Sequence, residues 1–250
     1  MISAWWRKLT ANVIHIPEND WQSAEADLPF LDRLTTDEHS RLRELAVRFI
    51  SEKQWTGAAG LTLTPLIQLS IALQACLPIL NLGLEHYRGW VGIIVYPGDF
   101  LIPRQIMDAD GVVHEYDDTV LGEAWEDGPV LLSWFDDLAE PGDVSIVIHE
   151  FAHKLDMGNG AVDGMPSLHR DMTETGWIAA FAPAYEDFCR RVDQGQETDI
   201  DPYAAEHPGE FFAVCSEVFF ETPALLKKLY PSVYEQLSKY YRQDPLTRNM

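Results

Sequence analysis

The sequence predicts an α+β fold: a mostly helical domain with a small mixed sheet that precedes a helix carrying the pattern HExxH. Segments with helical periodicity lie near the beginning and the end of the chain, and short β-branched runs between Gly and Pro turns lie in the middle. No repeat or linker divides the chain. Its 250 residues, 46% of them hydrophobic, can bury a large core, so we expect a single domain over residues 1–250.

The N-terminal third is predicted to be helical. Thr35 and Glu38 have the spacing of a capping box, and the apolar residues after them fall on one face of a helix that reaches about residue 51. A second helix is expected over residues 65–77, with Thr64 as its N-cap and Pro65 in its first turn.

This second helix belongs to an uncharged stretch, residues 61–84, which is long enough to span a bilayer. Polar residues and prolines interrupt the stretch. The leucines form a helical stripe rather than an all-round apolar surface, which favours a buried helix over a membrane span. The stripe consists of Leu66, Leu69, Leu73 and Leu77.

Short strands are predicted in the middle of the chain. Residues 91–96 form a β-branched run that ends at Pro97-Gly98, which indicates a buried strand. Further strands are expected at residues 112–116, near 124–125 and at 130–134, because glycine turns separate these runs.

Helical periodicity returns after residue 142. A helix is expected over residues 143–157, with Asp143 as its cap and Gly158 as its terminator, and a loop over residues 158–166. Further helices are predicted at residues 176–194, broken or restarted at Pro183, and then at 208–220 and 232–242.

Charge and cysteine content restrict the class of protein. With 18 Lys and Arg against 40 Asp and Glu, the net charge is −22, and no basic run could bind a phosphate backbone, so we expect no nucleic-acid partner. The three cysteines are widely spaced and form no CxxC pair, which is typical of a reducing compartment. No apolar stretch follows Arg7 and Lys8 as a secretory signal requires, so we expect a cytoplasmic protein without a membrane partner.

The pattern HExxH occurs at residues 149–153 within the predicted helix. His149 and His153 lie about 40° apart around a helix and one turn apart along it, so both imidazoles can bind one ion. Glu150 cannot easily be a third ligand from its adjacent position, but it can take a proton from a metal-bound water and return it to a leaving amine. The alternative is a solvated histidine pair on an ordinary helix.

A catalytic zinc ion usually has three protein ligands, so a third must come from elsewhere in the chain. Glu210 interrupts an otherwise apolar first turn of the helix over residues 208–220, where a buried carboxylate requires a cation. Glu217 follows on the same face about 10 Å further along, so it can orient a ligand histidine rather than bind the ion. Alternatively, Glu210 only favours the helix N-terminus and Glu217 is a surface residue.

Other groups near these motifs are weaker candidates for the site. Asp156 could reach the helix face of His153, but helix-end solvation or an ion pair is the favoured interpretation. The extended HExxH motif of the metzincins is excluded, because it requires a metal ligand at the position of Asn159. Tyr203 could donate a hydrogen bond to the oxyanion that forms at a carbonyl, although a tyrosine in a loop often only packs. Six histidines lack paired spacing and are interpreted as structural or surface groups, with the last two as the strongest exceptions: His15, His39, His86, His114, His169 and His207.

The chain resembles the Mlc titration factor family, the glucose-regulatory zinc peptidases of bacteria. Five segments carry the resemblance: residues 75–80, 89–97, 128–134, 147–157 and 203–217. The resemblance implies a zincin-like domain with a gluzincin-like site, related to the catalytic domain of anthrax lethal factor. It further implies one Zn²⁺ bound by His149, His153 and Glu210, with Glu150 as base and Tyr203 as the transition-state tyrosine.

The resemblance also implies aminopeptidase-type activity on short peptides and, in enteric bacteria, binding to the repressor Mlc, which controls sugar phosphotransferase uptake. Our first hypothesis is therefore a cytosolic zinc-dependent peptidase. The alternative is a non-catalytic regulatory protein that sequesters a transcriptional repressor. A purely structural zinc is disfavoured, because two histidines and one glutamate leave a position open for water.

Overall fold

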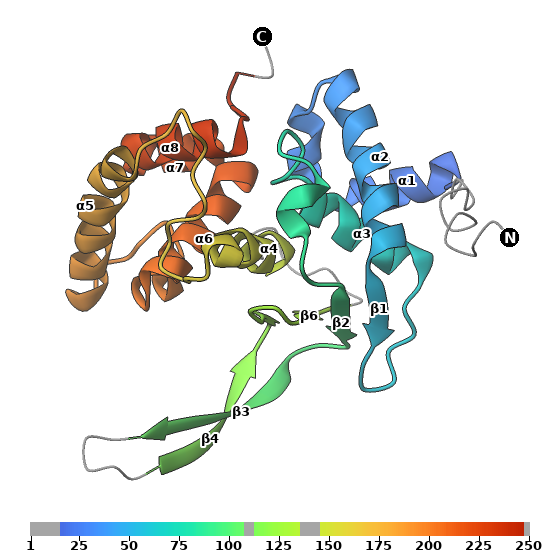
Figure 1. Ribbon diagram of the computed structural model, residues 1–250, viewed down its shortest axis with the longest axis horizontal. Coiled ribbons are helices and arrows are strands. Elements are labelled where there is room, and N and C mark those ends of the chain that lie inside the picture. Colours follow the sequence, from blue (N-terminus) through green and yellow to red (C-terminus); the bar gives the residue numbers. More distant parts are fainter. Residues whose placement is uncertain (1–15, 108–112, 136–145, 248–250) are drawn as a thin grey trace, which may run out of the picture.

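The computed structural model describes residues 16–107, 113–135 and 146–247. In the described residues, helix α4, which carries HExxH, lies between a group formed by α1–α3 and a group formed by α5–α8 (Figure 1). The helices and strands are α1 (Glu18–Ala26), α2 (Thr36–Glu52), β1 (Gln54–Gly57), α3 (Pro65–Cys76), β2 (Gly92–Tyr96), β3 (Phe100–Met107), β4 (Val113–Val120), β5 (Gly122–Ala124), β6 (Val130–Ser133), α4 (Ile146–Asp156), α5 (Glu174–Asp193), α6 (Pro208–Glu221), α7 (Pro223–Leu229) and α8 (Pro231–Tyr241).

The main sheet is small and mixed, with the strand order β1-β2-β6-β5. β1, β2 and β6 run parallel, and β5 pairs antiparallel with β6 at one edge. β3 and β4 form a separate antiparallel hairpin that extends away from the helices (Figure 1). All four strands of the main sheet precede α4, which confirms the predicted α+β class with its sheet before the HExxH helix.

The first two predicted helices are present. Thr35 and Glu38 form both bonds of the capping box at the start of α2, and the Thr64 side chain caps α3. α3 is a buried helix, as predicted, but its burial is not confined to the leucine stripe: Leu66 is 43% exposed, while every residue from 69 to 76 is buried. The physical reason is position: α3 packs against α1, α2 and α4, so it needs apolar surface all round.

The strand predictions were incomplete. β1 and β3 were missed, because QWTG is short and polar and FLIPRQIM contains a proline and an arginine in its middle. Strand β4 extends to Val120, beyond the predicted end at residue 116. In β2 the side chains alternate between buried and half-buried, so this strand is not buried throughout as predicted. Pairing with neighbouring strands stabilises these segments, and a single run does not encode it.

The helices of the second half differ from prediction at their ends. The predicted cap Asp143 lies outside the described residues. α4 ends at Asp156 and continues as a 3₁₀ turn (Met157–Asn159), and the left-handed residue that ends this turn is Gly160, with φ 87°, rather than Gly158. α5 is one continuous helix that contains Pro183, so the predicted break is absent.

A large aromatic cluster packs one side of α4. Phe151 contacts Phe49, Tyr87 and Trp90, with ring centroids 5.1 to 5.7 Å apart. Residues 147–156 of α4 are all buried, so this helix is fixed at the centre of the described structure. In the part of the chain that the structure describes, no helix has the length and apolar character needed to cross a membrane.

Candidate metal site and its surroundings

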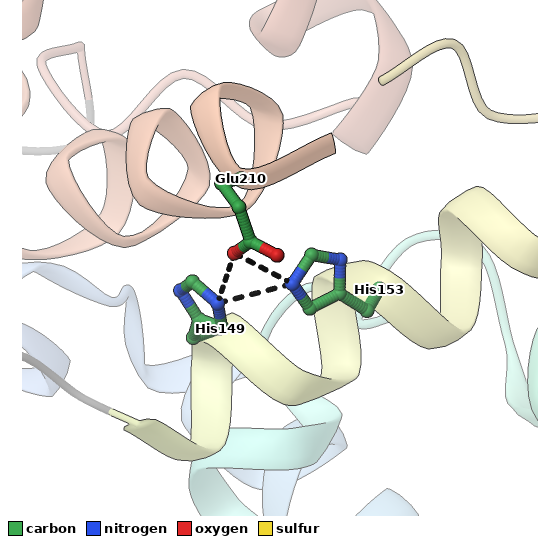
Figure 2. A group of neighbouring side chains, drawn as sticks. All are labelled: His149, His153 and Glu210. Carbon is green, nitrogen blue, oxygen red and sulfur yellow. Dashed lines mark hydrogen bonds and ion pairs between the residues drawn. The ribbon is translucent and has the colours of Figure 1, made fainter. Parts of the chain in front are cut away.

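Three side chains from two helices meet at one point. His149 and His153 project from successive turns of α4, and their Nε2 atoms are 3.0 Å apart. Oε2 of Glu210, in the first turn of α6, lies 3.0 Å from Nε2 of His149 and 3.1 Å from Nε2 of His153 (Figure 2). Two ring nitrogens and one carboxylate oxygen are thus arranged so that they can hold a single metal ion.

The start of α6 determines where Glu210 lies. His207 is the N-cap, and its Nδ1 accepts a hydrogen bond from the backbone N–H of Gly209. Pro208 occupies the first position, where its fixed φ and missing N–H favour helix initiation. Because α6 packs against α4, the carboxylate two residues after Pro208 reaches the histidines.

A second carboxylate fixes the orientation of His149. Oε1 of Glu217, which is buried on α6, lies 2.5 Å from Nδ1 of His149. If Nδ1–H donates to Glu217, the Nε2 atom of neutral His149 carries a lone pair that points toward His153 and Glu210. The predicted contact between Glu217 and a histidine is therefore present, and Glu217 is not a surface residue.

The electrostatics of this cluster require positive charge at its centre. Burial alone would lower the pKa of His149, but hydrogen bonds to Glu210 and Glu217 outweigh it and raise the pKa well above its ordinary value. Burial opposes ionisation of Glu210, yet hydrogen bonds to His149 and His153 lower its pKa to about 2. A proton or a metal ion supplies this charge, but only an ion can bind both Nε2 atoms and the carboxylate together, so the donor set fits a divalent cation.

Glu150 lies beside the cluster and is only 3% exposed. Burial raises its pKa to about 8; His149 opposes this shift and Glu210 adds to it. β5 packs directly on its carboxylate: a Cβ atom on Gly122 would lie 2.6 Å from Oε1 of Glu150. A carboxyl group with a pKa in this range can gain or lose a proton close to neutral pH. The role of Gly122 was not predictable from the sequence, because a glycine in a short strand indicates a close approach without identifying its partner.

Lys154 connects α4 to the turn between β5 and β6. Its Nζ donates hydrogen bonds to the backbone carbonyls of Trp125, at 2.5 Å, and Gly128, at 3.0 Å. Burial lowers the pKa of Lys154 to about 8. This contact holds the edge strand β5 over the HExxH helix. It was not predicted from the sequence. The available signal was a lysine directly after HExxH in a helix that also carries an apolar stripe.

Tyr203 lies next to the cluster in a 3₁₀ turn (Pro202–Ala205). Its ring centroid is 6.1 Å from that of His149, and 46% of the residue is exposed. The carboxylate of Asp201 accepts a hydrogen bond from the Tyr203 N–H and so fixes the turn. Tyr203 is therefore a half-exposed residue beside the cluster and is not part of the core.

Asp156 differs from prediction. It is fully buried, and its Oδ2 accepts a hydrogen bond from the backbone N–H of Gly164 at 2.8 Å. It therefore does not solvate a helix end, and among the described residues it forms no ion pair. Of the two histidines near motif segments, His169 bonds the carbonyl of Tyr240 and His207 caps α6, so both have structural partners.

Comparisons with known proteins agree with this geometry. The model of the family described as glucose-regulated metallo-peptidase M90 matches residues 2–242. Mlc titration factor A of Klebsiella pneumoniae subsp. pneumoniae is 37% identical over 237 residues, which cover 92% of this chain and 88% of that protein. Mlc titration factor A of Escherichia fergusonii is 38% identical over 241 residues, and that of Salmonella arizonae is 38% identical over 234 residues. These alignments cover 93% and 91% of this chain, and 90% and 92% of the relatives, respectively.

Proposed function

This chain belongs to the glucose-regulated metallo-peptidase M90 family, and we propose that it hydrolyses peptide bonds with one zinc ion held by His149, His153 and Glu210. The observation that carries this proposal is the convergence of two Nε2 atoms and one carboxylate oxygen from α4 and α6. Imidazole and carboxylate are common zinc ligands, and three protein ligands leave one coordination position open, as in catalytic rather than structural sites.

When bound, zinc supplies Lewis-acid chemistry, which lowers the pKa of a water molecule to about 7 and polarises the carbonyl of the substrate. Glu150 accepts a proton from the attacking water as its oxygen bonds to the peptide carbon. As the C–N bond breaks, Glu150 passes this proton to the leaving amine. Burial brings its pKa closer to neutrality, which lowers the cost of moving a proton on and off this carboxyl group.

Tyr203 supplies the second electrostatic contribution in this proposal. Its hydroxyl donates a hydrogen bond to the carbonyl oxygen as negative charge develops there. The exposed position of the ring beside His149 supports this role, because a substrate can approach it from solvent.

We propose that the activity is of the aminopeptidase type, in line with the family resemblance. Hydrolysis of alanine p-nitroanilide, compared with its N-acetylated form, tests this point. An aminopeptidase cleaves the first and not the second, whereas equal cleavage of both would contradict the assignment.

A cytoplasmic location is part of the same proposal. The three cysteines are compatible with it because all are free thiols: Cys76, Cys189 and Cys215.

The decisive experiment compares two variants of the full chain. Glu150→Gln keeps all three ligands, so it should retain zinc by elemental analysis while hydrolysis falls at least 100-fold. Glu210→Ala removes one ligand and should lose the ion. Parental activity in Glu150→Gln, or full zinc occupancy in Glu210→Ala, would contradict the mechanism.

A second function is favoured by the name of the relatives, Mlc titration factor A. We infer that this chain binds the repressor Mlc, and that this binding does not require peptide hydrolysis. A pull-down of Mlc with the parent chain, Glu150→Gln and His149→Ala tests it. Equal capture by all three separates the two functions, whereas loss of capture in both variants would make the site part of the binding mechanism.

A further inference from the structure

The residues of the loop at 161–165 connect three helices near the proposed metal site. The backbone N–H of Gly164 donates to Oδ2 of Asp156 at the end of α4. The carbonyl of Gly164 accepts a hydrogen bond of 2.9 Å from Nε1 of Trp177 on α5. Both backbone polar groups of this buried glycine are therefore fixed, one by each helix.

The α-carbon of Gly164 touches the start of the third helix, α6. A Cβ atom on Gly164 would lie 2.4 Å from the carbonyl oxygen of Pro208 and 3.4 Å from the nitrogen of Gly209. On the α6 side, a Cβ atom on Gly209 would lie 3.2 Å from the side chain of Val162 in the same loop and 3.4 Å from its carbonyl oxygen. The loop and the first turn of α6 thus lie in close contact, with a glycine on each side. The backbone φ of Gly164 is 79°, which also favours glycine.

Glu210 follows these two residues directly, so the contact determines the position of its backbone. Oε2 of Glu210 lies within 3.1 Å of both Nε2 atoms. Metal–ligand distances tolerate only about 0.2 Å of deviation, so a displacement of the first turn of α6 would separate the carboxylate from the histidines.

We propose that Gly164 is a positioning residue for the third metal ligand: it lets the first turn of α6 approach α4 closely enough for Glu210 to meet His149 and His153. This inference rests on the proposed function, because it assumes that these three residues bind the ion. Hydrogen bonds to Asp156 and Trp177 fix the backbone of Gly164, so the loop acts as a spacer between the end of α4 and the first turn of α6.

The chain offers a matched pair of glycines for the test. Gly164→Ala and Gly160→Ala both place a side chain on a left-handed backbone, with φ of 79° and 87°. A Cβ atom on Gly160 meets nothing within 4 Å, whereas one on Gly164 displaces Pro208. Zinc affinity of the full chain is measured by competition with a chromogenic chelator, and the stability of the metal-free chain by urea unfolding.

We expect Gly164→Ala to bind zinc at least tenfold more weakly than the parent, and Gly160→Ala to bind within twofold of it. A loss of stability shared by both variants reports only the backbone strain. Parental zinc affinity in a folded Gly164→Ala chain would overturn the inference, as would an equal loss of affinity in Gly160→Ala.

A milder variant keeps the test decisive if Gly164→Ala does not fold. Trp177→Phe keeps an aromatic ring but removes the hydrogen bond to the Gly164 carbonyl, so zinc affinity should fall several-fold. Parental affinity in this variant would then overturn the inference. If the parent chain itself binds no zinc, the proposed function fails; if the parent binds and these variants bind equally well, only the role of Gly164 fails.

Discussion

Glu217 and His149 form a buried hydrogen bond of 2.5 Å, and this bond turns the opposite edge of the imidazole toward Glu210. Both carboxylates come from α6, seven residues apart, and they contact the two nitrogens of one ring. One helix therefore contributes both the carboxylate that faces the proposed ion and the carboxylate that orients another ligand.

Removing the Glu217 carboxylate should weaken metal binding. Glu217→Ala leaves Nδ1 of His149 without a buried acceptor, so we expect zinc affinity to fall by about 10- to 100-fold. Glu217→Gln keeps an amide oxygen that can accept the bond and should lose less. Chelator competition measures both, with exposed Glu235→Gln on α8 as the control. Unchanged affinity in Glu217→Ala would show that His149 needs no such support.

A methyl group on β5 should impair catalysis without releasing the metal. Gly122→Ala forces the Glu150 carboxylate away from the edge strand, and misplacement of a reacting group by about 1 Å can cost about 100-fold in rate. We expect kcat to fall at least tenfold while zinc content stays at the parental value. Gly92→Ala in β2 is the control, because its Cβ atom would meet Pro129 at 3.0 Å instead. A parental kcat for Gly122→Ala would refute this account of the contact.

The hydroxyl of Tyr203 should matter for rate and not for folding. Tyr203→Phe removes one donor to the developing charge, so kcat should fall by about 100- to 1,000-fold, with zinc affinity unchanged. The exposed position of the ring limits the expected change in unfolding free energy to about 0.5 kcal/mol. Steady-state kinetics are compared with Tyr230→Phe, which removes a hydroxyl that bonds Asp187 elsewhere in the chain. Equal kcat in both variants would assign Tyr203 a packing role only.

Lys53 should make stability depend on pH in the alkaline range. Its Nζ donates to the carbonyls of Tyr87 and Trp90, and burial lowers its pKa to about 8; Glu52 opposes this shift and Lys154 adds to it. Between pH 8 and the ordinary pKa of about 10.5, the unfolded chain binds more protons than the folded chain, so the contribution of Lys53 to stability rises with pH.

Urea unfolding of the parent and of Lys53→Met at pH 7 and at pH 10 measures this contribution. The parent should gain free energy of unfolding relative to the variant at the higher pH. Lys239→Met, at an exposed position on α8, controls for loss of a surface charge. A difference between parent and Lys53→Met that is constant with pH, or that shrinks as pH rises, would contradict the prediction.

Much of the secondary structure was predictable because its signals are local. The capping box at Thr35, the cap at Thr64 and the proline at the start of α6 each depend on residues within one turn of each other. β1 and β3 were missed and the break at Pro183 was wrong, because neighbouring strands and helices decide those outcomes. The roles of Glu150, Tyr203 and the three metal-binding residues stay predictions until the variants are measured.

By itself, the sequence determined that His149 and His153 share one face, because a spacing of four residues in a helix repeats almost one full turn. It also identified Glu210 and Glu217 as acidic residues that interrupt an apolar helix. Only the tertiary structure decided that these carboxylates contact the two edges of one imidazole, that Gly122 lies on Glu150 and that Gly164 lies on Pro208. The physical reason is that periodicity fixes directions within an element, whereas the distance between two elements depends on the side chains, or missing side chains, packed between them.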